Sequence, residues 1–144
     1  MSARRKGREL ALQVLYQLDM SGESAEQGLH AFADSFDVSE KARELAWQLV
    51  RGVREGREEI DAHVAGVSEH WKLDRLAQID ATVIRIAVYE MLTGLPMEIA
   101  INEAVEVARR YGTTESAAFV NGVLDAVAKR LGLERGRKAA PEEP

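Results

Sequence analysis

The fold class follows from the stretch at residues 113–132, which reads TTESAAFVNGVLDAVAKRLG. Its larger aliphatic side chains recur at helical spacing, so one stripe of the segment is predicted to face a core. The residues of this stripe are Val120, Val123, Leu124, Val127 and Leu131. Thr113 or Thr114 can cap the start of the helix by accepting backbone N–H groups, and Gly132 suits its end. The segment therefore predicts a terminal helix with one buried face.

Two features of this helix bear on its surroundings. The dipeptide Asn121-Gly122 is typical of a hairpin turn, but the apolar period continues through it, so a helix is predicted. A glycine here costs about 1 kcal/mol relative to alanine, which predicts close packing of another helix at Gly122 and a packing role for Asn121. Phe119 lies beside the apolar stripe and is predicted to be partly exposed on the first turn.

The same period predicts further helices at residues 5–20, 29–36, 39–66, 81–92 and 99–111, with a turn or two at 73–79. Gly52 and Gly56, inside the long third segment, predict close packing or a bend. Asp80 is predicted to cap the helix that begins at residue 81. No segment alternates like a half-buried strand, so we expect an all-α fold. It would contain about seven helices in two antiparallel sub-bundles joined near Trp71.

The expected organisation is a basic N-terminal arm at residues 1–8, one helical domain at 5–133 and a disordered polar tail at 134–144. The sub-bundles would span about residues 5–68 and 72–132. The chain of 144 residues has no run of eighteen apolar residues and no signal-peptide core, which favours a cytoplasmic protein.

Several chemical functions are disfavoured by the composition. Without cysteine there are no disulfides, thiolate zinc sites or thiol catalysis. His30, His63 and His70 lack metal-ligand spacing, and no glycine-rich phosphate loop follows a strand. Carboxylates such as Asp80 and Glu103 could form an acid–base pair, but helix caps and helix-end interactions explain them more simply. We therefore expect no metal, no cofactor and no enzymatic activity.

Charge is distributed unevenly along the chain. The arm carries four basic side chains and no acidic one, whereas residues 9–144 carry 15 basic and 24 acidic side chains, a net charge of −9. The four are Arg4, Arg5, Lys6 and Arg8. Such an arm is either a solvated tail or a contact for nucleic-acid phosphates. The start of the last helix adds backbone N–H groups, the Ser116 hydroxyl and the Phe119 ring, which suit a phosphate and an unpaired base. Single-stranded RNA is the favoured ligand.

Four blocks of sequence, in order, resemble the NusB family of bacterial transcription antitermination factors over nearly the whole chain. The blocks are Arg8-Glu9-x-Ala11-x-x-x-Leu15-Tyr16-Gln17, Ile79-Asp80-x-x-x-Ile84-Arg85-Ile86-Ala87-x-Tyr89-Glu90, Ala100-Ile101-Asn102-Glu103-Ala104-Val105-Glu106 and Phe119-Val120-Asn121-Gly122-Val123-Leu124-Asp125. The resemblance implies a non-enzymatic adaptor that pairs with NusE, the ribosomal small-subunit protein that is also a transcription factor. The heterodimer would bind single-stranded boxA RNA in nascent ribosomal RNA. With RNA polymerase and other Nus factors it would suppress termination and aid ribosomal RNA maturation.

By position, the resemblance also implies site residues. The RNA-binding residues would be Arg4, Arg5, Lys6, Arg8, Glu115, Ser116 and Phe119, and the NusE-binding residues Tyr16 and Asp80. Two alternatives stay open. One is a homo-oligomeric helical interaction module, such as a homodimer. The other is an RNA-recognition module of an assembly that modifies ribosomal RNA, because the module also resembles the N-terminal domain of certain ribosomal RNA cytosine methyltransferases. Their separate Rossmann-type catalytic domain would not fit within 144 residues.

Overall fold

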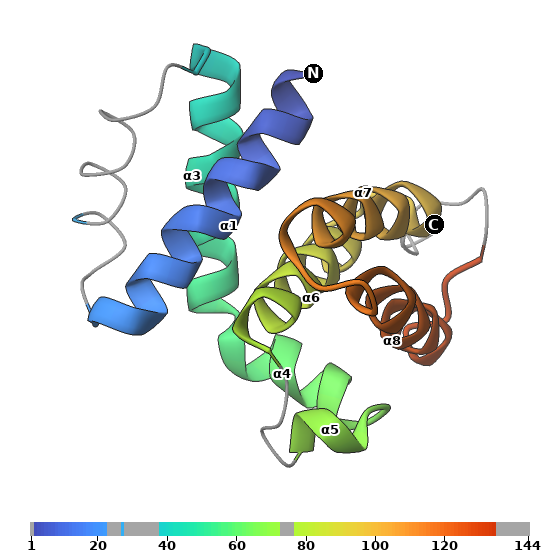
Figure 1. The fold of residues 1–144 in the computed structure, drawn as a ribbon. Coiled ribbons are helices and arrows are strands. Elements are labelled where there is room, and N and C mark those ends of the chain that lie inside the picture. The colour runs from blue at the N-terminus through green and yellow to red at the C-terminus, as the bar shows by residue number, and fades with distance from the viewer. Residues whose placement is uncertain (1, 23–26, 28–37, 73–76, 135–144) are drawn as a thin grey trace. The chain divides into compact units, whose positions relative to one another are not determined.

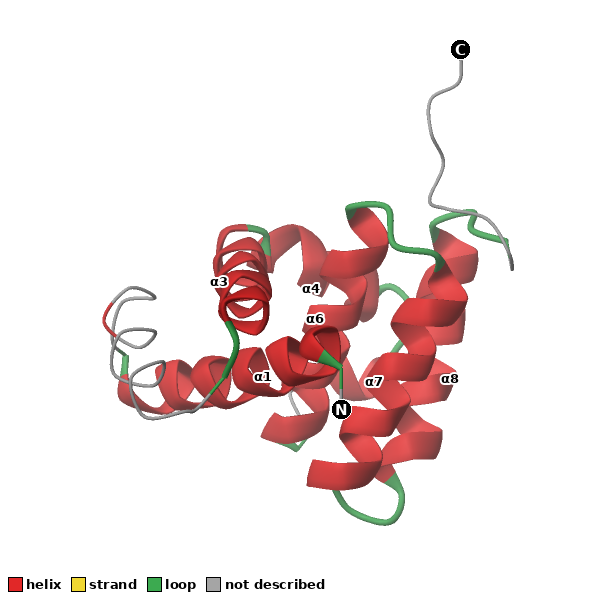
Figure 2. Ribbon diagram, turned by 90° about the horizontal axis from the view of Figure 1, so that it is seen from above, coloured by secondary structure: helices red, strands yellow, loops and turns green. Residues whose placement is uncertain are grey.

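The computed structural model describes residues 2–22, 27, 38–72 and 77–134. The helices in chain order are α1 (Ala3–Ser21), α3 (Glu40–Glu55), α4 (Arg57–Ala65), α5 (Glu69–Lys72), α6 (Gln78–Leu92), α7 (Met97–Tyr111) and α8 (Ser116–Arg130) (Figure 1). Figure 2 shows no strand in these described ranges, which confirms the all-α prediction with about seven helices. No described helix is long and apolar enough to cross a membrane. The predicted helix at 29–36 and residues 135–144 of the predicted tail lie outside the described residues.

The chain divides into two compact units, residues 1–55 and 56–144. In the first unit α1 packs against α3. The Ser2 hydroxyl accepts the backbone N–H of Arg5 at 3.0 Å and caps α1, which ends at Gly22 with a φ of 77°. The basic arm is therefore the first two turns of a helix that starts slightly before the predicted residue 5. Because the arm is helical, the direction of each Cα–Cβ bond is fixed.

The contact between α1 and α3 is closest at Gly7. A Cβ atom there would lie 3.0 Å from the carbonyl oxygen of Ala42 and from the side chain of Leu45. α3 starts where predicted, since the Ser39 hydroxyl accepts the backbone N–H of Ala42 at 3.2 Å. A small residue on α1 thus allows the first turns of α1 and α3 to lie side by side (Figure 1).

The predicted long helix at 39–66 is divided in two. Gly56 has φ −95° and ψ 14° between α3 and α4, so the bend expected at a glycine is present. The division between the two units falls here rather than near Trp71. The reason is that α4 packs against α5, α6 and α8, with Ile60 and Val64 fully buried. The apolar period continues through Gly56, so the sequence does not show that the packing partners change from α1 to α5, α6 and α8 at this point.

An ionic cluster joins α4, α5 and α6 within the second unit. The Arg85 Nε atom of α6 donates to an Asp61 carboxylate oxygen of α4 at 2.8 Å, and Arg57 Nε reaches the other oxygen at 3.4 Å. The Arg85 guanidinium also lies 4.7 Å from the centre of the Trp71 ring in α5. The segment predicted to join two halves is therefore held against the second one.

The core of the second unit is built around α6, which packs against α4, α7 and α8, as its strongly apolar sequence predicts. Two sequence expectations are wrong here. Asp80 is not the N-cap, because α6 starts at Gln78 and places Asp80 in its first turn. Asn121 and Gly122 are not packing residues, since both are exposed. Among the described residues, no atom outside the local helix backbone lies within 4 Å of a Cβ built at Gly122.

Candidate nucleic-acid interface

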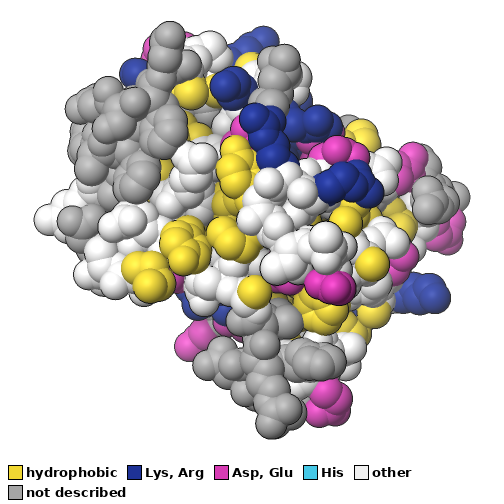
Figure 3. Space-filling model, viewed as in Figure 1, with side chains coloured by type: hydrophobic (Ala, Val, Ile, Leu, Met, Phe, Trp, Pro, Cys, Tyr) yellow, Lys and Arg dark blue, Asp and Glu magenta, His cyan; other side chains and the backbone are white. Residues whose placement is uncertain are grey.

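The four basic side chains at the start of α1 do not share one environment. Arg4 and Lys6 are exposed and Arg5 is half-buried. Arg8 is only 4% exposed and already takes part in an interaction within the chain. In Figure 3, Lys and Arg side chains gather near the start of α1. The surface charge of the arm is thus provided by its first turn, and Arg8 is placed as part of the packed helix.

The turn before α8 is closed by Ser116. Its hydroxyl accepts the backbone N–H of Thr113 at 2.9 Å and lies 3.2 Å from the Thr113 hydroxyl. The threonine cap predicted from the sequence is thus replaced by the reverse arrangement, and Glu115, the N-cap residue, makes no side-chain cap bond. Ser116 is 1% exposed, so its hydroxyl holds the turn rather than facing solvent.

Gly112 is the residue that makes this turn possible. A Cβ atom at position 112 would overlap the Ser116 hydroxyl and lie 2.9 Å from the carbonyl oxygen of Ala108. Gly112 has an extended backbone with φ −98°, so space rather than backbone conformation requires a glycine. The close contact fixes the end of α7 against the start of α8.

Glu115 and Phe119 are the accessible residues of the predicted site on α8. Glu115 is exposed, and Phe119 is half-buried, as its place beside the apolar stripe predicts. Phe119 is also engaged in an interaction within the chain. A partly exposed ring can offer one face or an edge to a base. The negative charge of Glu115, however, does not attract a phosphate.

Two arginines at the end of α7 were not among the site residues predicted from the sequence. Arg109 NH1 lies 2.6 Å from a Glu106 carboxylate oxygen, and the exposed Arg110 lies with its guanidinium 5.8 Å from the centre of the Tyr111 ring. The sequence feature that could have revealed them is this pair of adjacent arginines, which ends five residues before Glu115. The charge of Arg109 is offset by Glu106, so Arg110 carries the positive charge at the end of α7.

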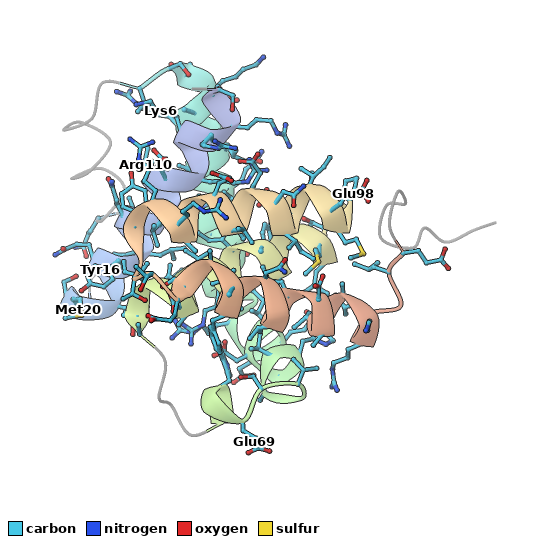
Figure 4. All side chains as sticks on the ribbon, turned by 45° about the vertical axis from the view of Figure 1, so that its right-hand side comes forward. Lys6, Tyr16, Met20, Glu69, Glu98 and Arg110 are labelled. Carbon is cyan, nitrogen blue, oxygen red and sulfur yellow. The ribbon has the colours of Figure 1, made fainter. Side chains whose placement is uncertain are left out.

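The predicted NusE-binding residues differ in accessibility. Tyr16 is 36% exposed, and Met20, one turn further along α1, is 67% exposed. Figure 4 shows both on the same part of α1, with Lys6 toward the other end of that helix. Asp80 is 8% exposed, and its Oδ1 atom has no hydrogen-bond partner among the described residues. Met20 was not predicted as a contact residue, because a single methionine at the end of a helix with many apolar residues is usually expected to be buried.

The described residues contain no group of three or more His, Asp or Glu side chains that could hold a metal ion. His63 instead accepts a hydrogen bond on Nδ1 from Arg130 Nε at 3.3 Å and lies 4.0 Å from Glu59. This histidine links α4 to α8 within the second unit.

Comparison with known proteins identifies the family. The NusB family model matches residues 5–129. The transcription antitermination protein NusB of Anaeromyxobacter sp. strain Fw109-5 is 48% identical over 136 residues, which are 93% of this chain and 95% of that protein.

Solved structures agree with this match. T. maritima NusB has a TM-score of 0.79 at 38% identity, covering 90% of this chain and 92% of the other. A NusB crystallised with NusE and dsRNA has a TM-score of 0.79 at 28% identity, covering 90% and 98%. The matched family is known for transcription antitermination and is not a known enzyme family. The chain therefore belongs to the NusB family.

Proposed function

We propose that this protein is a non-enzymatic, RNA-binding transcription antitermination factor that acts in the cytoplasm as a heterodimer with NusE. The heterodimer binds single-stranded boxA RNA in nascent ribosomal RNA, suppresses termination together with RNA polymerase and other Nus factors, and aids ribosomal RNA maturation. The observation that carries the proposal is the match to NusB along nearly the whole chain, including a relative crystallised with NusE and RNA.

Two surfaces of this chain support an RNA ligand. Arg4 and Lys6 are exposed on the first turn of α1, where they can displace counterions from a phosphate backbone. Glu115 and Phe119 are accessible at the start of α8, where the ring can stack on an unpaired base. We propose that RNA phosphates bind at the first turn of α1 and that an unpaired base stacks on Phe119.

We propose that NusE supplies the additional positive charge that RNA binding requires. The first turn of α1 offers two or three surface cations, whereas the rest of the chain has a net charge of −9 and repels RNA. A basic partner covers acidic surface and lengthens the RNA track, so the heterodimer should bind boxA more tightly than this chain alone. Tyr16 and Met20 provide an exposed apolar contact on α1 for that partner.

A titration of labelled boxA RNA at one fixed salt concentration tests the proposal. We expect the mixture with NusE to bind boxA more tightly than this chain alone, and more tightly than a scrambled RNA of the same length. A duplex of boxA with its complement is the third ligand, because a relative was crystallised with dsRNA. Equal affinity for boxA with and without NusE would contradict the role given to the heterodimer.

A homo-oligomeric interaction module remains the alternative with a specific observation in its favour, the exposed Tyr16 and Met20 on α1. Sedimentation of the protein alone and with NusE separates the two. The heterodimer predicts a one-to-one complex on addition of NusE. A homodimer that NusE leaves intact would support the alternative.

A further inference from the structure

A surface pocket of about 400 Å³ lies within the first unit, between the starts of α1 and α3. From α1 it is lined by Ser2, Ala3 and Arg4. From α3 it is lined by Lys41, Glu44, Leu45 and Gln48. The pocket lies on the same turn of α1 that carries the exposed Arg4 and Lys6.

The polar groups of the pocket favour an anion. Arg4 and Lys41 come from different helices, and both are exposed. The Gln48 amide and the Ser2 hydroxyl can each donate a further hydrogen bond. Glu44 is the one acidic residue of the lining, so the two cations leave a net charge of +1. The volume falls in the range of small-molecule sites and can hold one nucleotide unit.

The backbone around the pocket is fixed before any ligand binds. Ser2 and Ser39 cap the two helix starts, with hydrogen bonds of 3.0 and 3.2 Å to the third residue after each cap. Gly7 packs against Ala42 and Leu45 and sets the separation of the two helices. The Cα positions of Arg4 and Lys41 are therefore set by packing, which lowers the ordering cost of gripping a ligand.

We propose that this pocket binds the phosphate backbone of RNA, with Arg4 and Lys41 as its two cations. The inference rests on the proposed function and extends it, because the RNA track continues from the first turn of α1 onto α3. The contact is made to phosphate and ribose and therefore adds affinity without reading the base sequence. Glu44 opposes the contact and keeps it weak.

Two substitutions on α3 with opposite charge effects test the proposal on the complex with NusE. Each phosphate contact in a single strand contributes about 0.7 to the slope of log K against log salt. Lys41→Gln should flatten the slope by about 0.7 and weaken binding about fivefold at 0.1 M salt, if the electrostatic contribution vanishes near 1 M. Glu44→Gln removes a repulsion at the same place and should tighten binding. An increase in affinity cannot result from misfolding.

Matched controls make the same charge changes on helices that do not line the pocket. Lys129→Gln lies in the last turn of α8 and Glu58→Gln in the first turn of α4, and both positions are exposed. We expect each control to change the affinity for RNA less than twofold. Circular dichroism of all four variants verifies that helicity is retained.

The outcomes separate the inference from the proposed function. Opposite shifts at Lys41 and Glu44, with small shifts in the controls, support the pocket. Binding by the unchanged protein with no shift in either α3 variant overturns the pocket and leaves the proposed function intact. If the unchanged protein with NusE binds no boxA RNA, both fail. Calorimetry with inorganic phosphate tests whether the pocket binds a free anion instead of RNA. If Lys41→Gln abolishes phosphate binding but does not change the affinity for RNA, the assignment of the pocket to RNA is overturned.

Discussion

The starts of α1 and α8 are both predicted contacts for RNA, but they are built in different ways. α1 begins at the Ser2 cap, and Arg4 and Lys6 are exposed on its first turn. α8 begins in a turn closed by Ser116, and the charged residue exposed there is the acidic Glu115. A helix start offers backbone N–H groups in both cases, but the side chains decide whether it attracts phosphate. We therefore propose that phosphate binds at α1 and that a base stacks at α8.

The largest effect is expected where the turn before α8 is tightest. Gly112→Ala would push a Cβ atom into the Ser116 hydroxyl and the Ala108 carbonyl oxygen, and should lower the free energy of unfolding by about 2–3 kcal/mol. Gly122→Ala is the matched control, because nothing lies near its Cβ and alanine favours a helix by about 1 kcal/mol. Urea denaturation measures both. Destabilisation by both changes to the same degree would contradict the difference between these glycines.

The second-largest effect is a loss of RNA affinity when the exposed cations of α1 are removed. Replacing Arg4 and Lys6 together by glutamine should weaken boxA binding by the NusE complex about 25-fold at 0.1 M salt and flatten the salt slope by about 1.4. The reason is the loss of two exposed charges, so stability should change little. Titrations at several salt concentrations give both values. Arg8→Gln contrasts with this pair, because the buried side chain predicts lost stability rather than a flatter slope. A slope unchanged in the double variant would remove α1 from the phosphate contacts.

The smallest effect is expected at Ser116. Ser116→Ala removes the acceptor of the Thr113 N–H group and should lower the free energy of unfolding by about 1 kcal/mol. At temperatures where the variant is folded, its affinity for RNA should change less than twofold, since the hydroxyl is buried within the turn. Denaturation and RNA titration on the same sample measure the two effects. A large loss of affinity at unchanged stability would show that the hydroxyl contacts RNA directly.

The sequence predicted most of this fold because its helices have regular apolar faces. α6 was expected to be central from its composition, and it packs against three other helices. The break at Gly56 was visible only as a bend, because the apolar period is the same on both sides while the packing partners change. Gly122 is the opposite case, because the sequence suggested a contact that is absent. A glycine within a helix suggests a closely packed second helix, but among the described residues no atom outside the local helix backbone lies within 4 Å of a Cβ built there.

The candidate site was less predictable for a physical reason. Periodicity places a residue on a face of its helix but does not show what lies opposite that face. Ser116 was expected at the surface, but the geometry of a four-residue turn directs its hydroxyl to Thr113. Arg8 continues a run of cations, yet helical rotation turns it inward. Lys41 is far from the arm in sequence, and only the packing of α3 on α1 brings it to the same pocket as Arg4.

We propose that RNA contacts the first turn of α1 and also the start of α8. Photo-crosslinking boxA RNA to this protein in complex with NusE, followed by mapping of the crosslinked peptides, tests the claim most directly. We expect crosslinks within residues 2–6 and at Phe119, both reduced by excess unlabelled boxA RNA. Crosslinks confined to other helices, with neither region labelled, would contradict the account.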